Sequence, residues 1–109
     1  MTELVDKKCK HQEGPALNSA DAASLLEQLD GWHICDDGKS IHRTFEFKNY
    51  YRTMAFVNAV AWIAHSEDHH PDMAVGYNRC GVRFSTHSAG GLSENDFISA
   101  AKIDLLLKA

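Results

Sequence analysis

The stretch His65-Ser66-Glu67-Asp68-His69-His70-Pro71-Asp72 constrains the fold of this chain most. Residues 49–66 contain no glycine or proline and are rich in Ala, Met, Val, Phe and Trp, which predicts a helix of about four to five turns. A proline disfavours helical backbone for the residue before it, so this helix should end near His69 or His70. The histidines are therefore expected at a corner between a helix and a strand, where they can face a ligand.

Two predicted hairpins flank this helix. The first joins strands at 32–35 and 40–47 through the turn Asp36-Asp37-Gly38. The second joins strands at 73–77 and 82–87 through a turn at 78–81. In its last strand the side chains of Val82, Phe84 and Thr86 alternate with those of Arg83, Ser85 and His87, so His87 is expected on a polar face.

Two further helices are predicted, one from Asn18 or Ser19 to Asp30-Gly31 and one from about Glu94 to Leu107. Ser93 and Asp96 have the spacing of a capping box at the start of the second of these. The element order is α-β-β-α-β-β-α. It predicts an α+β domain with a four-stranded antiparallel sheet and three helices packed on one face.

The chain has 109 residues, enough for one domain and one core. Residues 1–16 contain few apolar side chains and are interpreted as a flexible N-terminal arm, and residues 17–109 as the single domain. Cys9 and His11 in the arm have no partner ligands at fixed spacing, which favours an exposed tail over a metal site.

Charge and cysteine usage exclude several classes of protein. The net charge of −4, with no basic stripe, argues against direct binding of nucleic acid or of an anionic membrane surface. No stretch approaches the roughly 18 apolar residues of a membrane span. The three cysteines form no C-x-x-C pair, which indicates a reducing compartment, and we expect a cytoplasmic protein.

The histidine cluster allows three readings from spacing alone. Near-neutral imidazoles beside an acidic group suit acid/base catalysis. Paired histidines at a helix end also occur as surface residues stabilised by the helix dipole. A zinc site would use His65 and His69, four residues apart, with further ligands among His70, His87, Glu67 and Asp72, but the pattern is not H-E-x-x-H, and no metal is expected.

Other polar residues carry weaker signals. Ser85 beside His87, and Cys80, lack the local signature of a nucleophile. His33 and His42 are interpreted as strand residues on a half-solvated face, and Arg43 as an edge or binding residue. Apolar side chains at Tyr50, Met54 and Trp62 extend beyond one helix face, which indicates a second subunit.

The spacing of the polar residues resembles a known family signature. His69-His70-Pro71 is followed after five residues by Tyr77, after nine more by His87 and after eight more by Asp96, with His65 four residues before His69. Together with Phe45-Glu46-Phe47-Lys48-Asn49-Tyr50, Ala55-Phe56-Val57, Ser85-Thr86-His87-Ser88 and Gly91-Leu92-Ser93, this resembles the pterin-4a-carbinolamine dehydratase family over roughly the last three-quarters of the chain.

The resemblance implies a hydro-lyase that removes water from 4a-hydroxytetrahydrobiopterin, the product of aromatic amino acid hydroxylases, to give quinonoid dihydropterin. It implies no cofactor and no metal. The implied catalytic residues are His69, His70 and His87: His69 and His70 transfer protons, and His87 holds the pterin or shares the acid role. Asp96 would orient a histidine, and Ser85, Thr86 and Tyr77 would contribute to substrate binding or orientation.

The resemblance also implies partners. A homodimer or homotetramer, formed through the helices, is expected, and an aromatic amino acid hydroxylase is the expected supplier of the reduced pterin. The alternative function is a protein-binding module, a dimerisation cofactor or regulator of a transcription factor or hydroxylase, with the same fold.

Overall fold

The computed structural model describes residues 3–108 and has the predicted α+β architecture. Residues 1, 2 and 109, which fall in the predicted arm and domain, lie outside the described part. The helices are α1 (Ser19–Leu26), α2 (Tyr50–Glu67) and α3 (Glu94–Leu105). The strands are β1 (His33–Ile34), β2 (Ile41–Glu46), β3 (Asp72–Val75) and β4 (Arg79–Phe84). Two short 3-10 helices, η1 (Leu4–Asp6) and η2 (His87–Ala89), complete the element order.

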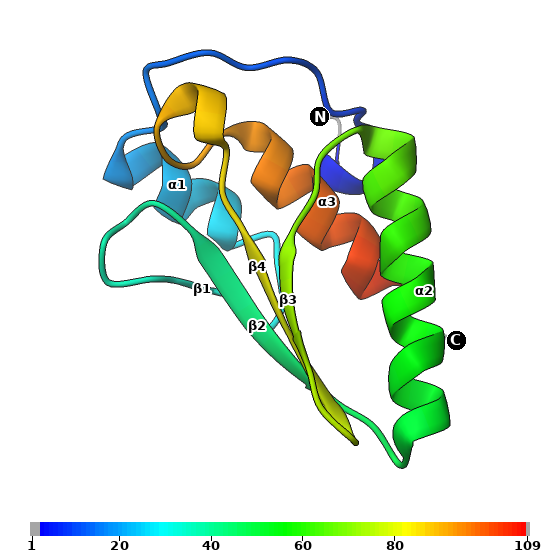
Figure 1. Ribbon diagram of the computed structural model, residues 1–109. Coiled ribbons are helices and arrows are strands. Elements are labelled where there is room, and N and C mark those ends of the chain that lie inside the picture. Colours follow the sequence, from blue (N-terminus) through cyan, green and yellow to red (C-terminus); the bar gives the residue numbers. More distant parts are fainter. Residues whose placement is uncertain (1–2, 109) are drawn as a thin grey trace.

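The four strands form one antiparallel sheet in the order β1-β2-β4-β3, and the three helices pack on one side of it (Figure 1). The register of the central pair runs from Ile41 opposite Phe84 to Glu46 opposite Arg79. Alternate residues of β4, namely Cys80, Val82 and Phe84, are buried. This period of two is that of a sheet with one face on the core and one face open.

The core lies between the sheet and helices α2 and α3. It contains Val60 of α2, Phe97 and Ile103 of α3, and Ile41 and Phe84 of the sheet, each at most 1% exposed. The capping box predicted at the start of α3 is confirmed, with Ser93 and Asp96 exchanging hydrogen bonds between side chain and backbone. This cap fixes the position of the first turn of α3 beneath the end of β4.

The second hairpin differs from its predicted boundaries. Its turn lies at Gly76–Asn78, closed by the Gly76 N–H donating to the Arg79 carbonyl over 2.8 Å, and β4 already begins at Arg79. Gly81 is a strand residue instead of a turn residue. A Cβ at this glycine would lie 3.2 Å from Nε2 of His42, so the side chain of His42 occupies the space above it.

The prediction of His87 in the last strand is wrong. β4 ends at Phe84, and His87 is the first residue of η2. Thr86 still has extended backbone and pairs with Gly91 in an isolated bridge, which closes a tight loop containing η2. His87 consequently projects from a loop at the end of the sheet, and the residues Ser88–Gly91 predicted as a flexible connection form that loop.

Helix α1 is shorter than predicted and ends at Leu26. The next residues continue in tighter turns, with the N–H groups of Gln28 and Leu29 donating to the carbonyls of Leu25 and Leu26. Leu29 still packs against the core. The apolar spacing therefore identified the buried side chains correctly and the end of the helix incorrectly.

The residues predicted as an arm make contacts along the domain. Leu4 in η1 is 3% exposed and belongs to the core, and the chain then runs beside α3 towards the loop that carries η2 (Figure 1). The flexibility of this segment and the domain boundary at residue 16 stay predictions. None of the helices in residues 3–108 has the length and apolar composition needed to cross a membrane.

Candidate active site

The candidate site begins at the C-terminal end of α2. Asp68 follows the last helical residue with left-handed backbone, at φ 52° and ψ 43°, and this reverses the chain direction. The His69 N–H then donates back to the Ala64 carbonyl over 3.1 Å. As a result the two adjacent histidines separate: the His69 side chain is only 12% exposed, whereas His70 lies on the surface.

The His69 ring lies between a carboxylate and an aromatic ring. Its Nε2 is 2.6 Å from Oδ1 of Asp96, and its plane stacks on Phe84 with centroids 5.6 Å apart and an interplanar angle of 12°. Asp96 is fully buried. This pair joins α2 to α3, and Phe84 at the end of β4 sets the ring plane.

The other oxygen of Asp96 is occupied as well. Its Oδ2 accepts the Thr86 hydroxyl at 2.9 Å and the Ser93 N–H at 3.0 Å. The two hydroxyls are 2.7 Å apart, and since Thr86 has one proton, which it donates to the carboxylate, Ser93 must donate to Thr86. An ionised carboxylate only accepts hydrogen bonds, so this arrangement has His69 donating from Nε2 and leaves Nδ1 as the ring nitrogen that can accept a proton.

Next to this network is a cavity of about 230 Å³, lined by a few polar side chains and by backbone, which we call the His87 cavity. Its lining residues are Lys39, Ser85, Thr86, His87, Gly90 and Gly91. Thr86 belongs to both structures, because it lines the cavity and also donates to Asp96. The cavity therefore connects to His69 through a chain of two hydrogen bonds.

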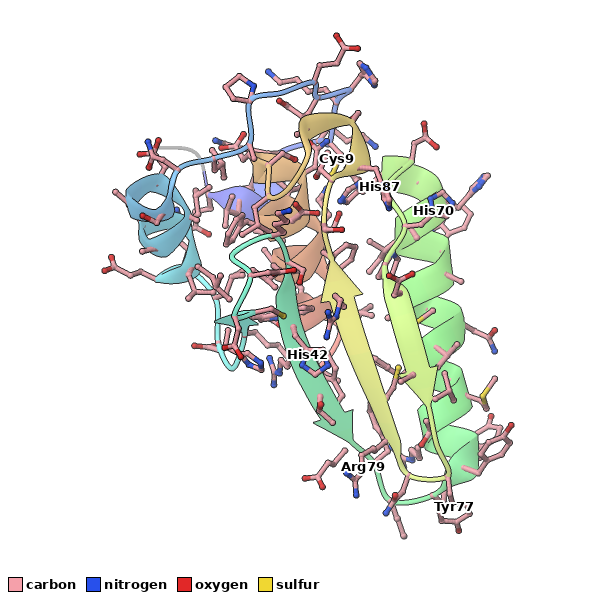
Figure 2. The ribbon with its side chains drawn as sticks, turned by 60° about the vertical axis from the view of Figure 1, so that its left-hand side comes forward. Cys9, His42, His70, Tyr77, Arg79 and His87 are labelled. Atoms are coloured by element: carbon pink, nitrogen blue, oxygen red, sulfur yellow. The ribbon has the colours of Figure 1, made fainter. Side chains whose placement is uncertain are left out.

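The structure brings most, but not all, of the predicted site residues to one end of the sheet. His69, Asp96 and Thr86 form one network, Ser85 and His87 line the adjacent cavity, and His70 lies at the same end (Figure 2). Tyr77 is not among them. It lies in the turn at the opposite end of the sheet, stacked on Tyr50 with centroids 6.4 Å apart (Figure 2).

Sequence reasoning missed two contributors. Ser93 was identified only as a helix cap, yet its hydroxyl also supports Thr86. Lys39 comes from the turn between β1 and β2 and lines the His87 cavity. No local sequence pattern indicates Lys39, because its approach depends on the folded loop, where a Cβ at Gly91 would lie 3.7 Å from Cγ of Lys39.

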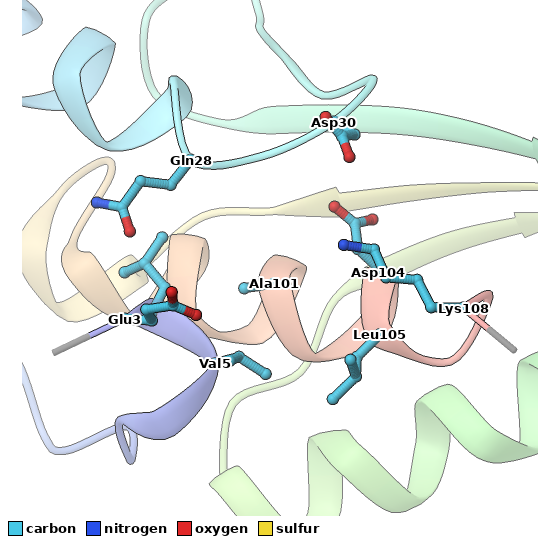
Figure 3. Close-up of a pocket in the computed structure, with 9 residues that line it drawn as sticks. Glu3, Val5, Gln28, Asp30, Ala101, Asp104, Leu105 and Lys108 are labelled. Atoms are coloured by element: carbon cyan, nitrogen blue, oxygen red, sulfur yellow. The ribbon is translucent and has the colours of Figure 1, made fainter.

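Arg43, interpreted from the sequence as an edge or binding residue, forms hydrogen bonds within the fold. Its Nη1 donates to the Asp30 carbonyl at 2.6 Å and to Oδ1 of Asp104 at 2.8 Å, and Trp32 Nε1 donates to the same carboxylate oxygen. Burial raises the pKa of Asp104, and the bonds from Trp32 and Arg43 oppose that increase. Asp104 borders a hollow of about 370 Å³ between η1 and α3 (Figure 3), which is separate from the histidine site.

No group of three His, Cys, Asp or Glu side chains within residues 3–108 is arranged to hold a metal ion. His65, the first histidine of the proposed zinc set, instead packs against Trp62 with ring centroids 6.1 Å apart. The imidazole and carboxylate groups at the site can form hydrogen bonds and transfer protons.

The fold and the site together define a class of protein: a small α+β domain that presents a partly buried histidine bonded to a buried aspartate, with two exposed histidines near it, at the end of a four-stranded sheet. The family model described as pterin 4 alpha carbinolamine dehydratase matches residues 15–106, and the chain belongs to that family.

Relatives in three bacteria agree with this assignment. Each is called "Putative pterin-4-alpha-carbinolamine dehydratase". The protein of Nitrosomonas eutropha is 62% identical over 108 residues, covering 96% of this chain and 94% of the relative. That of Nitrosospira multiformis is 59% identical, covering 97% and 94%. That of Legionella pneumophila strain Corby is 55% identical, covering 97% and 96%.

Two solved structures have the same fold. One is described as a transcriptional coactivator/pterin dehydratase from Brucella melitensis, with 34% identity, a TM-score of 0.80, and coverage of 84% of this chain and 97% of that one. The other, a pterin dehydratase-like protein described as a RuBisCO assembly factor in the alpha-carboxysome, has 21% identity and a TM-score of 0.63, covering 72% and 92%. The second comparison supports the fold alone.

Proposed function

We propose that this protein is a hydro-lyase that removes water from 4a-hydroxytetrahydrobiopterin to give quinonoid dihydropterin, in the cytoplasm, and so recycles the pterin released by an aromatic amino acid hydroxylase. The hydrogen bond between His69 and the buried Asp96 is the observation that carries this proposal. It orients one imidazole and leaves one of its nitrogens free for proton transfer, as acid/base catalysis requires.

The reaction needs one acid and one base. The bond between C4a and the hydroxyl oxygen breaks as the oxygen receives a proton and leaves as water, and the ring N5 gives its proton to a base. In our proposal Nδ1 of His69 and the imidazole of His70 carry out these two proton transfers, one histidine as the acid and the other as the base. His87 binds the pterin or shares the acid role. Atoms balance without any metal or redox cofactor, since the bonding electrons of N5–H form the new C4a–N5 double bond.

The polar groups around His69 support this assignment. Thr86 and Ser85 line the His87 cavity, which suits the amide and amine edge of a pterin ring. Lys39 on the same cavity adds a donor. Asp96 acts on His69 in this proposal as a positioning residue, because both of its oxygens are already occupied by protein donors.

The test is the dehydration of freshly generated 4a-hydroxytetrahydropterin, followed by absorbance. We expect the wild type to accelerate the reaction and His69→Ala, His70→Ala and His87→Ala each to lose at least tenfold, which corresponds to about 1.4 kcal/mol of barrier. His33→Ala, an exposed histidine of β1, is the matched control and should retain wild-type activity. A wild type no faster than buffer would overturn the proposal.

A second candidate function is protein binding. Its supporting observation is the exposed aromatic surface of α2, where Tyr51 is 80% and Trp62 is 69% exposed. The 34%-identical Brucella protein is also described as a transcriptional coactivator. We propose that α2 binds a second copy of this chain, giving a dimer or tetramer, and that a regulatory partner would use the same helix. A His69→Ala/His70→Ala variant should lose dehydration and keep this association.

A further inference from the structure

The segment of residues 7–12, which we call the strap, lies across three elements that carry the candidate site. It is bound to Glu67 at the end of α2, to Asn95 in the first turn of α3 and to Ser88 in η2. Each of these partners lies within two residues of a site residue. Glu67 is two residues before His69. Asn95 directly precedes Asp96, and Ser88 directly follows His87. One short segment therefore contacts three of the parts of the backbone that position the site.

Glu67 is a buried carboxylate that binds both the strap and α3. Only 4% of its side chain is exposed, and it accepts the Cys9 N–H at 2.8 Å on one oxygen and Nζ of Lys102 at 3.1 Å on the other. Lys8, whose side chain is 70% exposed, lies 3.3 Å from the second oxygen. Burial alone would raise the pKa of Glu67, but these donors lower it overall.

Asn95 holds the strap by two hydrogen bonds to one residue. Its Oδ1 accepts the Lys10 N–H at 3.1 Å, and its Nδ2 donates to the Lys10 carbonyl at 2.6 Å. Asn95 is 5% exposed. A side-chain amide that pairs with both backbone groups of one residue fixes the orientation of that residue as a strand neighbour would. The Cys9 Sγ adds contacts with the Asn95 carbonyl and with Ser99 of α3.

The site needs such support because its own elements are short at this end. η2 has three residues, and the corner at Asp68 is a single left-handed residue. Small displacements there would change the separation of His87 from His69, and a displacement of about 1 Å can lower a catalytic rate by 10²-fold.

We propose that the strap is a positioning element of the active site and that Glu67 and Asn95 are the positioning residues that hold it. This inference rests on the proposed function for its effect on rate, but its structural part can be measured without substrate.

Two variants loosen the strap in different ways. Asn95→Ala removes both bonds to Lys10 and leaves α3 with a better helix former. The double variant Glu67→Met/Lys102→Met removes the Cys9 acceptor and replaces a partly buried ion pair by apolar side chains, an exchange that is often neutral or stabilising for buried pairs. Asn18→Ala is the matched control, because it removes an amide from the N-cap of α1, outside the strap and the site.

Three readouts distinguish positioning from general stability. Backbone hydrogen exchange at 66–70 and 86–88 reports the corner and η2. The imidazole N–H resonance of His69 reports its bond to Asp96, since a strongly bonded, buried N–H is shifted downfield and protected from solvent. Steady-state kinetics separate kcat from KM. In both variants we expect the backbone amides of 66–70 and 86–88 to exchange at least tenfold faster and the imidazole N–H signal of His69 to broaden. We expect kcat to fall about tenfold with little change in KM.

The outcomes separate the two proposals. A wild type that does not dehydrate the pterin overturns the proposed function, and the exchange and imidazole readouts still test the strap. Exchange and imidazole signals like those of the wild type in both loosened variants overturn the strap. Faster exchange with unchanged kcat in an active enzyme also overturns it, and an equal loss in Asn18→Ala shows that the effect comes from stability alone.

Discussion

At the scale of the residue, Asp96 is the most constrained group of the site. A buried carboxylate is costly unless its oxygens are hydrogen-bonded, and here His69, Thr86 and the Ser93 N–H supply the donors. Each donor comes from a different part of the chain. Removal of any one of them leaves a lone pair buried without a partner, so the cost should appear in stability as well as in activity.

Thr86 and Ser85 provide a direct comparison. Both were predicted to bind the substrate, but the Thr86 hydroxyl donates to buried Asp96 whereas Ser85 is half-buried on the cavity wall. We expect Thr86→Val to lower the free energy of unfolding by about 1–3 kcal/mol and Ser85→Ala to change it by less than about 0.5 kcal/mol. Urea denaturation measures both values. Equal losses would contradict the role assigned to Thr86.

His42 makes stability depend on pH. Burial, the neighbouring His33 and Arg83 all lower its pKa from the ordinary value of 6.5. The unfolded chain therefore takes up a proton on this residue at a higher pH than the folded chain, and the free energy of unfolding falls as pH drops through 6.5. We expect His42→Gln to reduce this fall. Denaturant unfolding at about pH 7.5 and about pH 5.5 tests it, and a fall in His42→Gln as large as in the wild type would contradict the assignment.

At the scale of the element, the sequence predicted the periodic features and missed the tertiary ones. Alternation in β4 and the Ser93 cap depend on local spacing, so they were predictable. Gly81 resembles a turn residue in the sequence, and only the position of His42 on the neighbouring strand explains it as a strand residue. The family resemblance implied that Asp96 orients a histidine, but which histidine it bonds, His69 at 27 residues' distance, follows from how α2 and α3 pack.

The end of α2 offers a test of element stability. Asp68 has φ 52°, a backbone conformation that glycine adopts with less strain. We expect Asp68→Gly to raise the free energy of unfolding by about 0.5–1 kcal/mol and Asp68→Val to lower it by a larger amount. Thermal denaturation of both variants measures the difference. A lower free energy of unfolding for Asp68→Gly would show that the aspartate side chain stabilises the fold by more than its left-handed backbone destabilises it.

At the scale of the whole molecule, the outward surface of α2 is an aromatic region that a single chain leaves uncovered. Its aromatic side chains extend along one helix 18 residues long, whereas the open face of the sheet exposes mainly polar groups such as Thr44 and Arg83. Exposed aromatic surface of this kind is typical of an interface, and a self-complementary patch favours a symmetric homo-oligomer.

Association through α2 predicts a specific loss. Trp62→Glu places a charge on this surface and should convert the proposed oligomer to monomers, because burying an unpaired carboxylate is unfavourable. Ala20→Glu on the exposed side of α1 is the control and should leave the assembly unchanged. Sedimentation velocity over a range of protein concentrations gives the result. A wild type that is monomeric at all concentrations would contradict the interface.

The strap has a consequence for the order of folding during synthesis. Its residues are synthesised well before its partners: Lys7 pairs with Glu94, 87 positions further on, and Cys9 with Glu67, 58 further on. Contacts of such sequence separation close large loops and form after local structure. The ribosome must therefore deliver the start of α3 before the strap can dock, and the corner at His69 should reach its final geometry only after the first turn of α3 has emerged.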